Sequence, residues 1–288
     1  MTYKKIEFLS PFAEQTSANH LTITILNETN YEAWAEKQTD AIKTQFAEAA
    51  FTAKPGKVFA LRDDHGKTES LIAGTNEEIE HLDGAKIYAS LCDSFSEKHL
   101  ENTSFEFSAG DLSEDELNRL YIGAGWAAYR FDRYKQDNPE KTLNIVLSDK
   151  ADQSRITAFV QGVCLIRDLV NTPANDMGPD ELQSAVNDIT AHHDVKMNVI
   201  KDNDLLEQNF PMIFEVGKGS SRRPRLLDFT WGDESHPKVT LVGKGVCFDT
   251  GGYDIKPSQF MLTMKKDMGG SAHVLGLAHM IMSLTLPI

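Results

Sequence analysis

Short runs of branched apolar residues alternate with longer segments of helical periodicity along the whole chain, and this alternation constrains the fold most. In the first half, such runs end in polar turns and predict strands at LTITILN (21–27), KVFALR (57–62), SLIAGT (70–75) and TLNIVLS (142–148). Apolar spacing predicts one helix over residues 30–51. A second helix begins after Ser113, where Glu116 completes a capping box, and runs to about Tyr134. Strands that alternate with helices are typical of an α/β fold.

The second half opens with a helix from about residue 152, whose apolar residues recur on one helical face. This helix ends at the sequence Asn171-Thr-Pro, and GPDELQSAVNDITAHH (178–193) predicts another helix with Pro179 near its start. Further strands are predicted at VKMNVI (195–200), RLLDFTW (225–231) and KVTLVGKG (238–245). We therefore expect a small α/β domain over residues 1–150 and a largely parallel α/β domain over residues 151–288.

The net charge of the chain bears on its binding partners, and the spacing of its cysteines bears on its cellular compartment. The 288 residues carry a formal net charge of -14, and such an acidic surface repels the phosphate backbone of nucleic acids. Cys92, Cys164 and Cys247 are far apart and form no CxxC pair, which fits a reducing cytosol. The N-terminus lacks the apolar core of a signal peptide, and the C-terminal apolar run is too short for a membrane span. These features predict a soluble cytoplasmic protein, for which membranes and nucleic acids are poor partners.

Four charged residues follow the strand predicted at KVTLV. A run of this kind is typical of a strand buried on both faces, so the polar residues after it should lie at the carboxyl end of a central strand. Open α/β sheets bind their ligands at that end. Lys244 follows the run, Asp249 and Lys256 lie on either side of a turn with two glycines, and Asp267 precedes a predicted helix start.

Two carboxylates and two lysines on a half-buried rim are costly unless something compensates their charge. Carboxylate oxygens suit divalent cations, and one aspartate can bridge two of them. A lysine amine can join these ligands only when it is neutral, which a neighbouring dication favours, whereas a protonated lysine can polarise a carbonyl. The spacing favours a metal-assisted hydrolase, although two surface ion pairs around a glycine turn explain it equally well. The phosphate-loop pattern G-x-x-x-x-G-K-[ST] is absent here.

A longer stretch, LVGKGVCFDTGGYDIKPSQFMLTMKKDMGGSAHV, resembles the signature region of the M17 leucyl (cytosol) aminopeptidases, a family of two-metal exopeptidases. Residues 166–182, 216–231 and 127–135 resemble other parts of the same family. The resemblance extends from about residue 120 to the end and is weak before it. It implies a catalytic domain of leucine-aminopeptidase type, of which residues 151–288 are the N-terminal part.

The resemblance also implies roles for individual residues. Lys244 would be the amine ligand of the tighter metal site, Asp249 would bridge both metals, and Asp267 would complete the tighter site. Lys256 would be the catalytic electrophile that holds the scissile carbonyl oxygen, and Met264 would line the pocket for the first side chain of the substrate. The implied cofactors are two divalent ions, zinc or manganese, with a bicarbonate in the complete enzyme. The implied substrates are peptides with leucine or similar residues at the N-terminus, and the implied assembly is a homohexamer.

One family segment, similar to NTDAEGR, supplies further metal ligands and the arginine that holds the bicarbonate, and this chain does not contain it. The sequence therefore predicts a truncated family member with little peptidase activity of its own. Two alternatives stay open: a non-catalytic scaffold or DNA-binding member of the family, and a nucleotide-binding α/β module. The four ionic residues favour the peptidase, because a site without catalytic duty would tend to lose such costly charges.

The remaining reactive side chains are assigned structural roles. His192 and His193 lie at a predicted helix end and are expected to be solvated. His273 and His279 lie six residues apart on the apolar C-terminal helix, and residues at this spacing do not lie on the same face of a helix. We therefore expect both side chains to have a structural role in packing. Cys247 has no histidine base nearby in the sequence and is expected to be an unreactive, buried thiol.

Overall fold

The computed structural model describes residues 6, 12–13, 16–135 and 142–288. Its contacts divide into two compact units, one of residues 10–160 and one of residues 161–288 together with the N-terminal segment that contains Ile6. The division falls inside helix α6 (Gln153–Asn171), whose two ends belong to different units. The domain boundary predicted near residue 150 lies just before this helix, and it stays a prediction.

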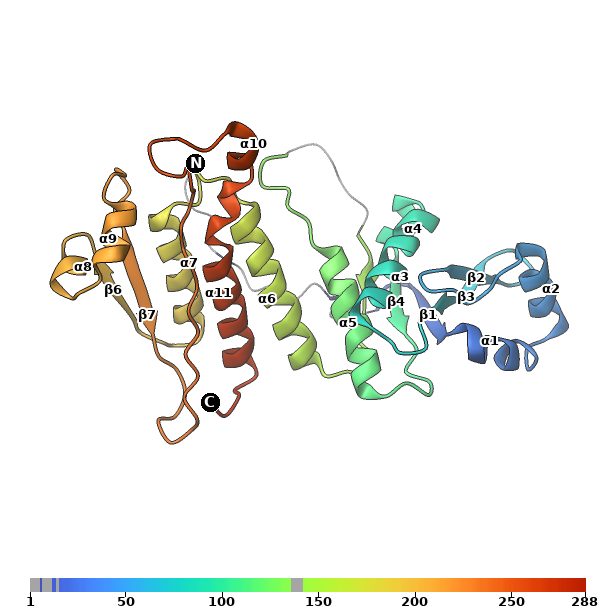
Figure 1. Cartoon of the computed structure of the whole chain (residues 1–288). Helices are drawn as coiled ribbons and strands as arrows, with labels where there is room; N and C mark the ends of the chain where they lie inside the picture. The colour runs from blue at the N-terminus through green and yellow to red at the C-terminus, as the bar shows by residue number, and fades with distance from the viewer. Residues whose placement is uncertain (1–5, 7–11, 14–15, 136–141) are drawn as a thin grey trace. The chain divides into compact units, whose positions relative to one another are not determined.

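The first unit is built on a five-stranded sheet (Figure 1). The strand order is β2-β3-β1-β4-β5, and β1 pairs in parallel with both β3 and β4, as does β4 with β5. Only the edge strand β2 is antiparallel, because a short turn joins it to β3. The strands are β1 (Asn19–Leu26), β2 (Val58–Arg62), β3 (Thr68–Gly74), β4 (Thr103–Phe107) and β5 (Asn144–Ile145). Thus β5 is shorter than the strand predicted over residues 142–148.

The helices of this unit follow the capping signals of the sequence. The single helix predicted over residues 30–51 is wrong: α1 (Glu28–Ala35) and α2 (Asp40–Ala49) are separate, and the side chain of Thr39 caps α2 by accepting a hydrogen bond from the Ile42 amide. The predicted capping box of Ser113 and Glu116 does begin α5 (Glu114–Ala128). That helix ends before Tyr134 because Tyr129 turns to an extended conformation. The other helices are α3 (His81–Ser94) and α4 (Glu97–Glu101).

Helices α3 and α5 approach each other so closely that only glycine fits at two positions. A Cβ on Gly84 would overlap the carbonyl oxygen of Leu120, and a Cβ on Gly123 would overlap that of His81. Tyr121 of α5 is fully buried, and its hydroxyl accepts hydrogen bonds from the Phe107 and Ser148 amides at 3.2 and 3.0 Å. These contacts tie the helix pair to the end of β4.

The second unit places three helices side by side, with two strands beside α7 (Figure 1). The helices are α6, α7 (Pro179–His192) and α11 (Gly269–Ser283), and the strands β6 (Met197–Lys201) and β7 (Arg225–Phe229) pair antiparallel. Buried residues from all three helices form one core, which includes Leu165 of α6, Ile189 of α7 and Leu275 of α11. Short helical segments complete the unit: α8 (Asp204–Glu207), α9 (Pro211–Gly217), α10 (Ser258–Met261) and the 3-10 helix η1 (Met264–Met268).

The strand predicted at residues 238–245 is wrong for this structure. The segment forms no ladder with any other described segment, and the side chains of Val239 and Val242 are 55% and 87% exposed. A run of apolar residues becomes a buried strand only where neighbouring strands pair with its backbone and side chains cover its faces. In the second unit, the only described strand pair is antiparallel, so the parallel sheet predicted for this half is not formed by these residues. No helix among the described residues is both long and apolar enough to cross a membrane.

Candidate active site

The first part of the candidate site is a loop that brings Asp249 and Lys256 together. Gly251 and Gly252 have φ values of +80° and +81°, a backbone region that favours glycine, and they let the chain reverse. The Lys256 amide then donates to the Thr250 carbonyl at 3.0 Å and closes the loop. Lys256 Nζ therefore lies 2.6 Å from Asp249 Oδ2, while the Gly251 amide donates to the other carboxylate oxygen at 2.8 Å.

The second part is the 3-10 helix η1, which holds Met264 and Asp267. Residues three apart lie above one another in a 3-10 helix, so these two side chains share one side of η1. Lys256 Nζ lies 3.3 Å from Met264 Sδ. Lys244 Nζ lies 2.9 and 2.8 Å from the two carboxylate oxygens of Asp267. The five predicted site residues thus form two ion pairs, one of which also contacts the methionine.

The backbone of Lys244 is fixed against the start of α11. The Ser271 amide, in the first turn of that helix, donates to the Lys244 carbonyl at 3.0 Å. The first amides of a helix have no partner within the helix, so this bond satisfies one of them and anchors the extended segment. The helix start, η1 and Lys244 are therefore held as one local arrangement.

The two ion pairs also interact with each other electrostatically. The hydrogen bond to Asp267 raises the pKa of Lys244, and the charge of Asp249 adds to this effect. The hydrogen bond from Lys256 and the one from the Gly251 amide lower the pKa of Asp249, with a further contribution from Lys244. Each ion pair joins one lysine to one aspartate, so the formal charges of the four groups cancel.

One atom of this site fits a metal ligand. Asp267 Oδ2 is buried and accepts no hydrogen bond from the described residues, although the Lys244 amine lies 2.8 Å away. The positive charge of Lys244 compensates this carboxylate at present, and a divalent cation could take its place at the same oxygen. Carboxylates of Asp249 and Asp267 with a neutral amine of Lys244 form a donor set for a divalent cation.

The sequence also predicts structural roles for Cys247 and for the histidines at the end of α7. Burial raises the pKa of the Cys247 thiol to about 11, so it is protonated at neutral pH, as expected for an unreactive cysteine. The prediction of solvated side chains holds for His192, which is exposed, and is wrong for His193, which is hydrogen-bonded to His279 of α11. The sequence gives no local signal for this contact, since 86 residues separate the two histidines.

The comparisons with known proteins agree with the signature carried by this loop. The catalytic-domain profile of the cytosol aminopeptidase family matches residues 164–288, and the N-terminal-domain profile of the M17 aminopeptidases matches residues 21–147. The chain belongs to the M17 family. Among its curated M17 relatives, a probable cytosol aminopeptidase of Clostridium perfringens is 36% identical over an alignment of 180 residues, and the match covers 57% of this chain and 36% of the relative. Peptidase B of Pectobacterium atrosepticum is 36% identical over an alignment of 162 residues, and the match covers 54% of this chain and 37% of that protein.

Solved structures confirm the fold class. The crystal structure of the cytosol aminopeptidase from Coxiella burnetii matches with a TM-score of 0.82 and 33% identity, covering 96% of this chain and 58% of the other. The bottromycin maturation enzyme BotP, in a structure with Mn, matches with a TM-score of 0.71 at 24% identity, covering 94% of this chain and 57% of BotP, and shows the fold alone. The α/β fold of leucine-aminopeptidase type is therefore confirmed. The chain spans well under half the length of the two curated M17 relatives described above.

Proposed function

We propose that this M17 chain carries one part of the active site of a metal-dependent exopeptidase, which releases leucine and similar N-terminal residues from peptides. The observation that carries the proposal is the convergence of two lysines, two aspartates and Met264 within the domain matched by the M17 catalytic profile. The Clostridium perfringens and Coxiella burnetii proteins, both named as cytosol aminopeptidases, support the same reaction class.

Lys244, Asp249 and Asp267 would hold the metal ions. When bound, two divalent ions would supply an activated water and polarise the scissile carbonyl. Lys244 would have to give up its proton to act as a ligand, because a protonated amine has no lone pair. Zinc and manganese are the ions that we propose for these oxygen and nitrogen ligands. A bicarbonate is proposed for the complete enzyme only.

Lys256 and Met264 would act on the substrate. Lys256 donates a hydrogen bond to Asp249, and its ammonium group would hold the carbonyl oxygen of the bond to be cleaved. The sulfur of Met264 lies 3.3 Å from the same ammonium group, so its apolar side chain would contact the first residue of a peptide held there. We propose that the chain alone has little activity, and that the complete protein is a cytoplasmic homohexamer.

Metal binding by the 288-residue chain tests the ligand assignment. We expect Asp267→Asn to weaken the binding of Mn²⁺ in a calorimetric titration by at least about 10-fold, because it removes a charged oxygen ligand. The matched control is Asp254→Asn, which removes an exposed aspartate in the glycine loop and should leave the titration unchanged. Equal Mn²⁺ binding by the wild-type chain and Asp267→Asn would contradict the assignment.

Peptidase activity tests the other half of the proposal. We expect the chain to hydrolyse leucine p-nitroanilide at least about 100-fold more slowly than the Coxiella burnetii enzyme, because loss of a single transition-state contact alone has such an effect. Rates comparable to that enzyme would show that the described residues suffice for catalysis and would refute the expectation of low activity.

A further inference from the structure

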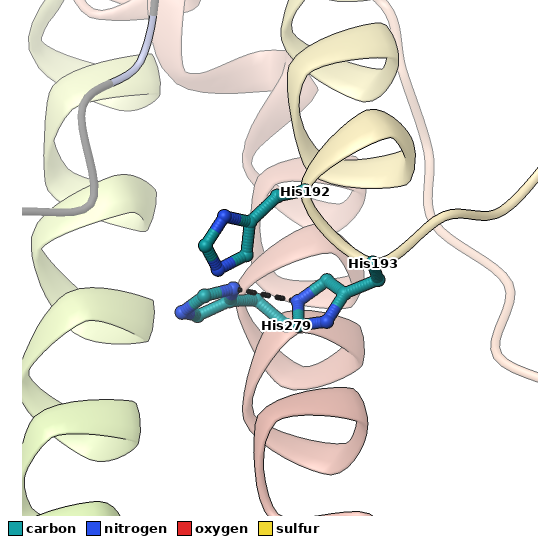
Figure 2. Close-up of side chains that lie close together, drawn as sticks. All are labelled: His192, His193 and His279. Atoms are coloured by element: carbon teal, nitrogen blue, oxygen red, sulfur yellow. Dashed lines mark hydrogen bonds between the residues drawn. The ribbon is translucent and has the colours of Figure 1, made fainter.

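Three imidazoles meet where the end of α7 lies beside the middle of α11 (Figure 2). His192 is the last residue of α7 and His193 is its C-cap, while His279 projects from α11 and is fully buried. One ring nitrogen from each lies within 4.8 Å of the others. His279 lies ten residues beyond the first residue of α11, about 15 Å along the helix, so the cluster is distinct from the site at the start of that helix.

Hydrogen bonds set the tautomer of the buried histidine. Nε2 of His279 lies 3.2 Å from Gln161 Oε1, an oxygen that can only accept, so this nitrogen carries the proton. Nδ1 of His279 is therefore unprotonated and accepts the hydrogen bond from Nε2 of His193, 3.1 Å away, and a bound metal ion would displace that proton from His193 Nε2 to solvent. Metal-ligating histidines are commonly held in this way, with one ring nitrogen donating to a carbonyl and the other turned to the metal.

The spacing of these atoms fits a metal ion between them. Two nitrogens bound at about 2.0–2.1 Å in tetrahedral geometry are about 3.3 Å apart. The distance of 3.1 Å between His193 Nε2 and His279 Nδ1 is within a few tenths of an ångström of that value. His192 is exposed at the helix end, so rotation of its side chain can bring the third nitrogen closer without disturbing the core.

The surroundings favour a bound cation. Both His192 and His193 lie at the C-terminal end of α7, a helix of 14 residues, and the carbonyl end of a helix attracts positive charge.

We propose that His192, His193 and His279 bind a divalent transition-metal ion such as Zn²⁺ at a site separate from the peptidase site. Three imidazole ligands select Zn²⁺, Cu²⁺ or Ni²⁺ over Mg²⁺ and Ca²⁺, which prefer oxygen ligands. A water molecule would take the fourth position. The ion would link the end of α7 to α11 and thereby stabilise the packing of these two helices.

The test uses the full chain with Asp249→Asn and Asp267→Asn, which removes the carboxylates of the proposed peptidase site. Titration with Zn²⁺ in a calorimeter should give one ion per chain, whereas Mg²⁺ should give no heat of binding. Adding His193→Ala should weaken Zn²⁺ binding by about 100-fold, and adding His192→Ala by at least about 10-fold. His192 is exposed, so its removal leaves the fold intact even if a variant at the buried His279 does not fold.

A matched control is His273→Ala, which removes an exposed histidine from the same helix and should leave the Zn²⁺ affinity unchanged. Co²⁺ in place of Zn²⁺ should give the intense visible absorption of a four-coordinate site, and His192→Ala should reduce it. Absence of Zn²⁺ binding in the carboxylate variant, or equal binding after removal of His192 and of His193, would overturn the proposal. Failure of the histidine-site proposal would not affect the peptidase proposal, because the peptidase proposal is tested separately by Mn²⁺ binding to the wild-type chain and to Asp267→Asn.

Discussion

The substitution Gly84→Ala tests how closely α3 and α5 pack in the first unit. An alanine Cβ at this position would overlap the carbonyl oxygen of Leu120 and lie 2.7 Å from the carbonyl carbon and 2.9 Å from Cα of the same residue. Carbon atoms in contact are normally about 3.5–4.0 Å apart, so the helices would have to separate by about 1 Å. Neither backbone can move aside alone, because both are held in helical hydrogen bonds.

The expected size of the effect follows from two opposing contributions. Overpacking of a tight core costs about 3 kcal/mol at the upper end of its usual range. Replacement of glycine by alanine in a helix returns about 1 kcal/mol through backbone entropy. The net loss is therefore about 2 kcal/mol in the free energy of unfolding, which lowers the Tm of a unit of this size by about 4–8 °C.

Differential scanning calorimetry of the full chain measures this change in the transition of the first unit. The matched control is Ala89→Gly, an exposed site on the same helix, which should lose about 1 kcal/mol and so measures the helix-propensity contribution directly. If Gly84→Ala raised the Tm, propensity alone would govern the site and the close approach of the helices would be disproved.

Two further predictions concern a helix cap and a titrating group. Ser113→Ala removes the side chain that caps α5 and should lower the free energy of unfolding of the first unit, measured by urea denaturation, by about 1 kcal/mol. Ser113→Asp can still cap the helix and should keep most of this stabilisation. Burial, with a smaller contribution from the neighbouring histidines, lowers the pKa of His279 to about 4. The neutral form of His279 therefore stabilises the folded state above about pH 6.5, the usual pKa of histidine in the unfolded chain. This stabilisation is lost as the pH falls from about 6.5 towards 4. Between pH 7.5 and pH 5 the second unit should lose about 2 kcal/mol more than a His279→Gln variant does, and equal losses in urea denaturation would contradict the assignment.

The helices of the second unit could be predicted well from the sequence. The apolar face after residue 152, the stop at Asn171-Thr-Pro and Pro179 at the next helix start correspond to α6 and α7 as the structure has them. These signals are local, because capping, proline and helical periodicity act over a few residues. The helix predicted over residues 30–51 failed for the same reason: periodicity continued through the break that Thr39 caps.

The segment at residues 238–245 shows the limit of composition as evidence. The apolar run of this segment predicts a buried strand. Whether the segment is buried depends on pairing with other segments, and no described segment pairs with it. The candidate site was more predictable. Asp249 and Lys256 lie on either side of a short glycine loop, and Met264 and Asp267 lie one helical turn apart, so nearness in sequence ensured nearness in space.

The sequence by itself determined the family, the local helices and the charged residues of the candidate site, because each depends on residues that are close along the chain. Only the tertiary structure decided that Lys244 pairs with Asp267, that α3 and α5 touch through Gly84 and Gly123, and that His193 meets His279. Such contacts join segments that the chain must first fold to bring together, and side-chain type does not specify which distant partner a residue will meet.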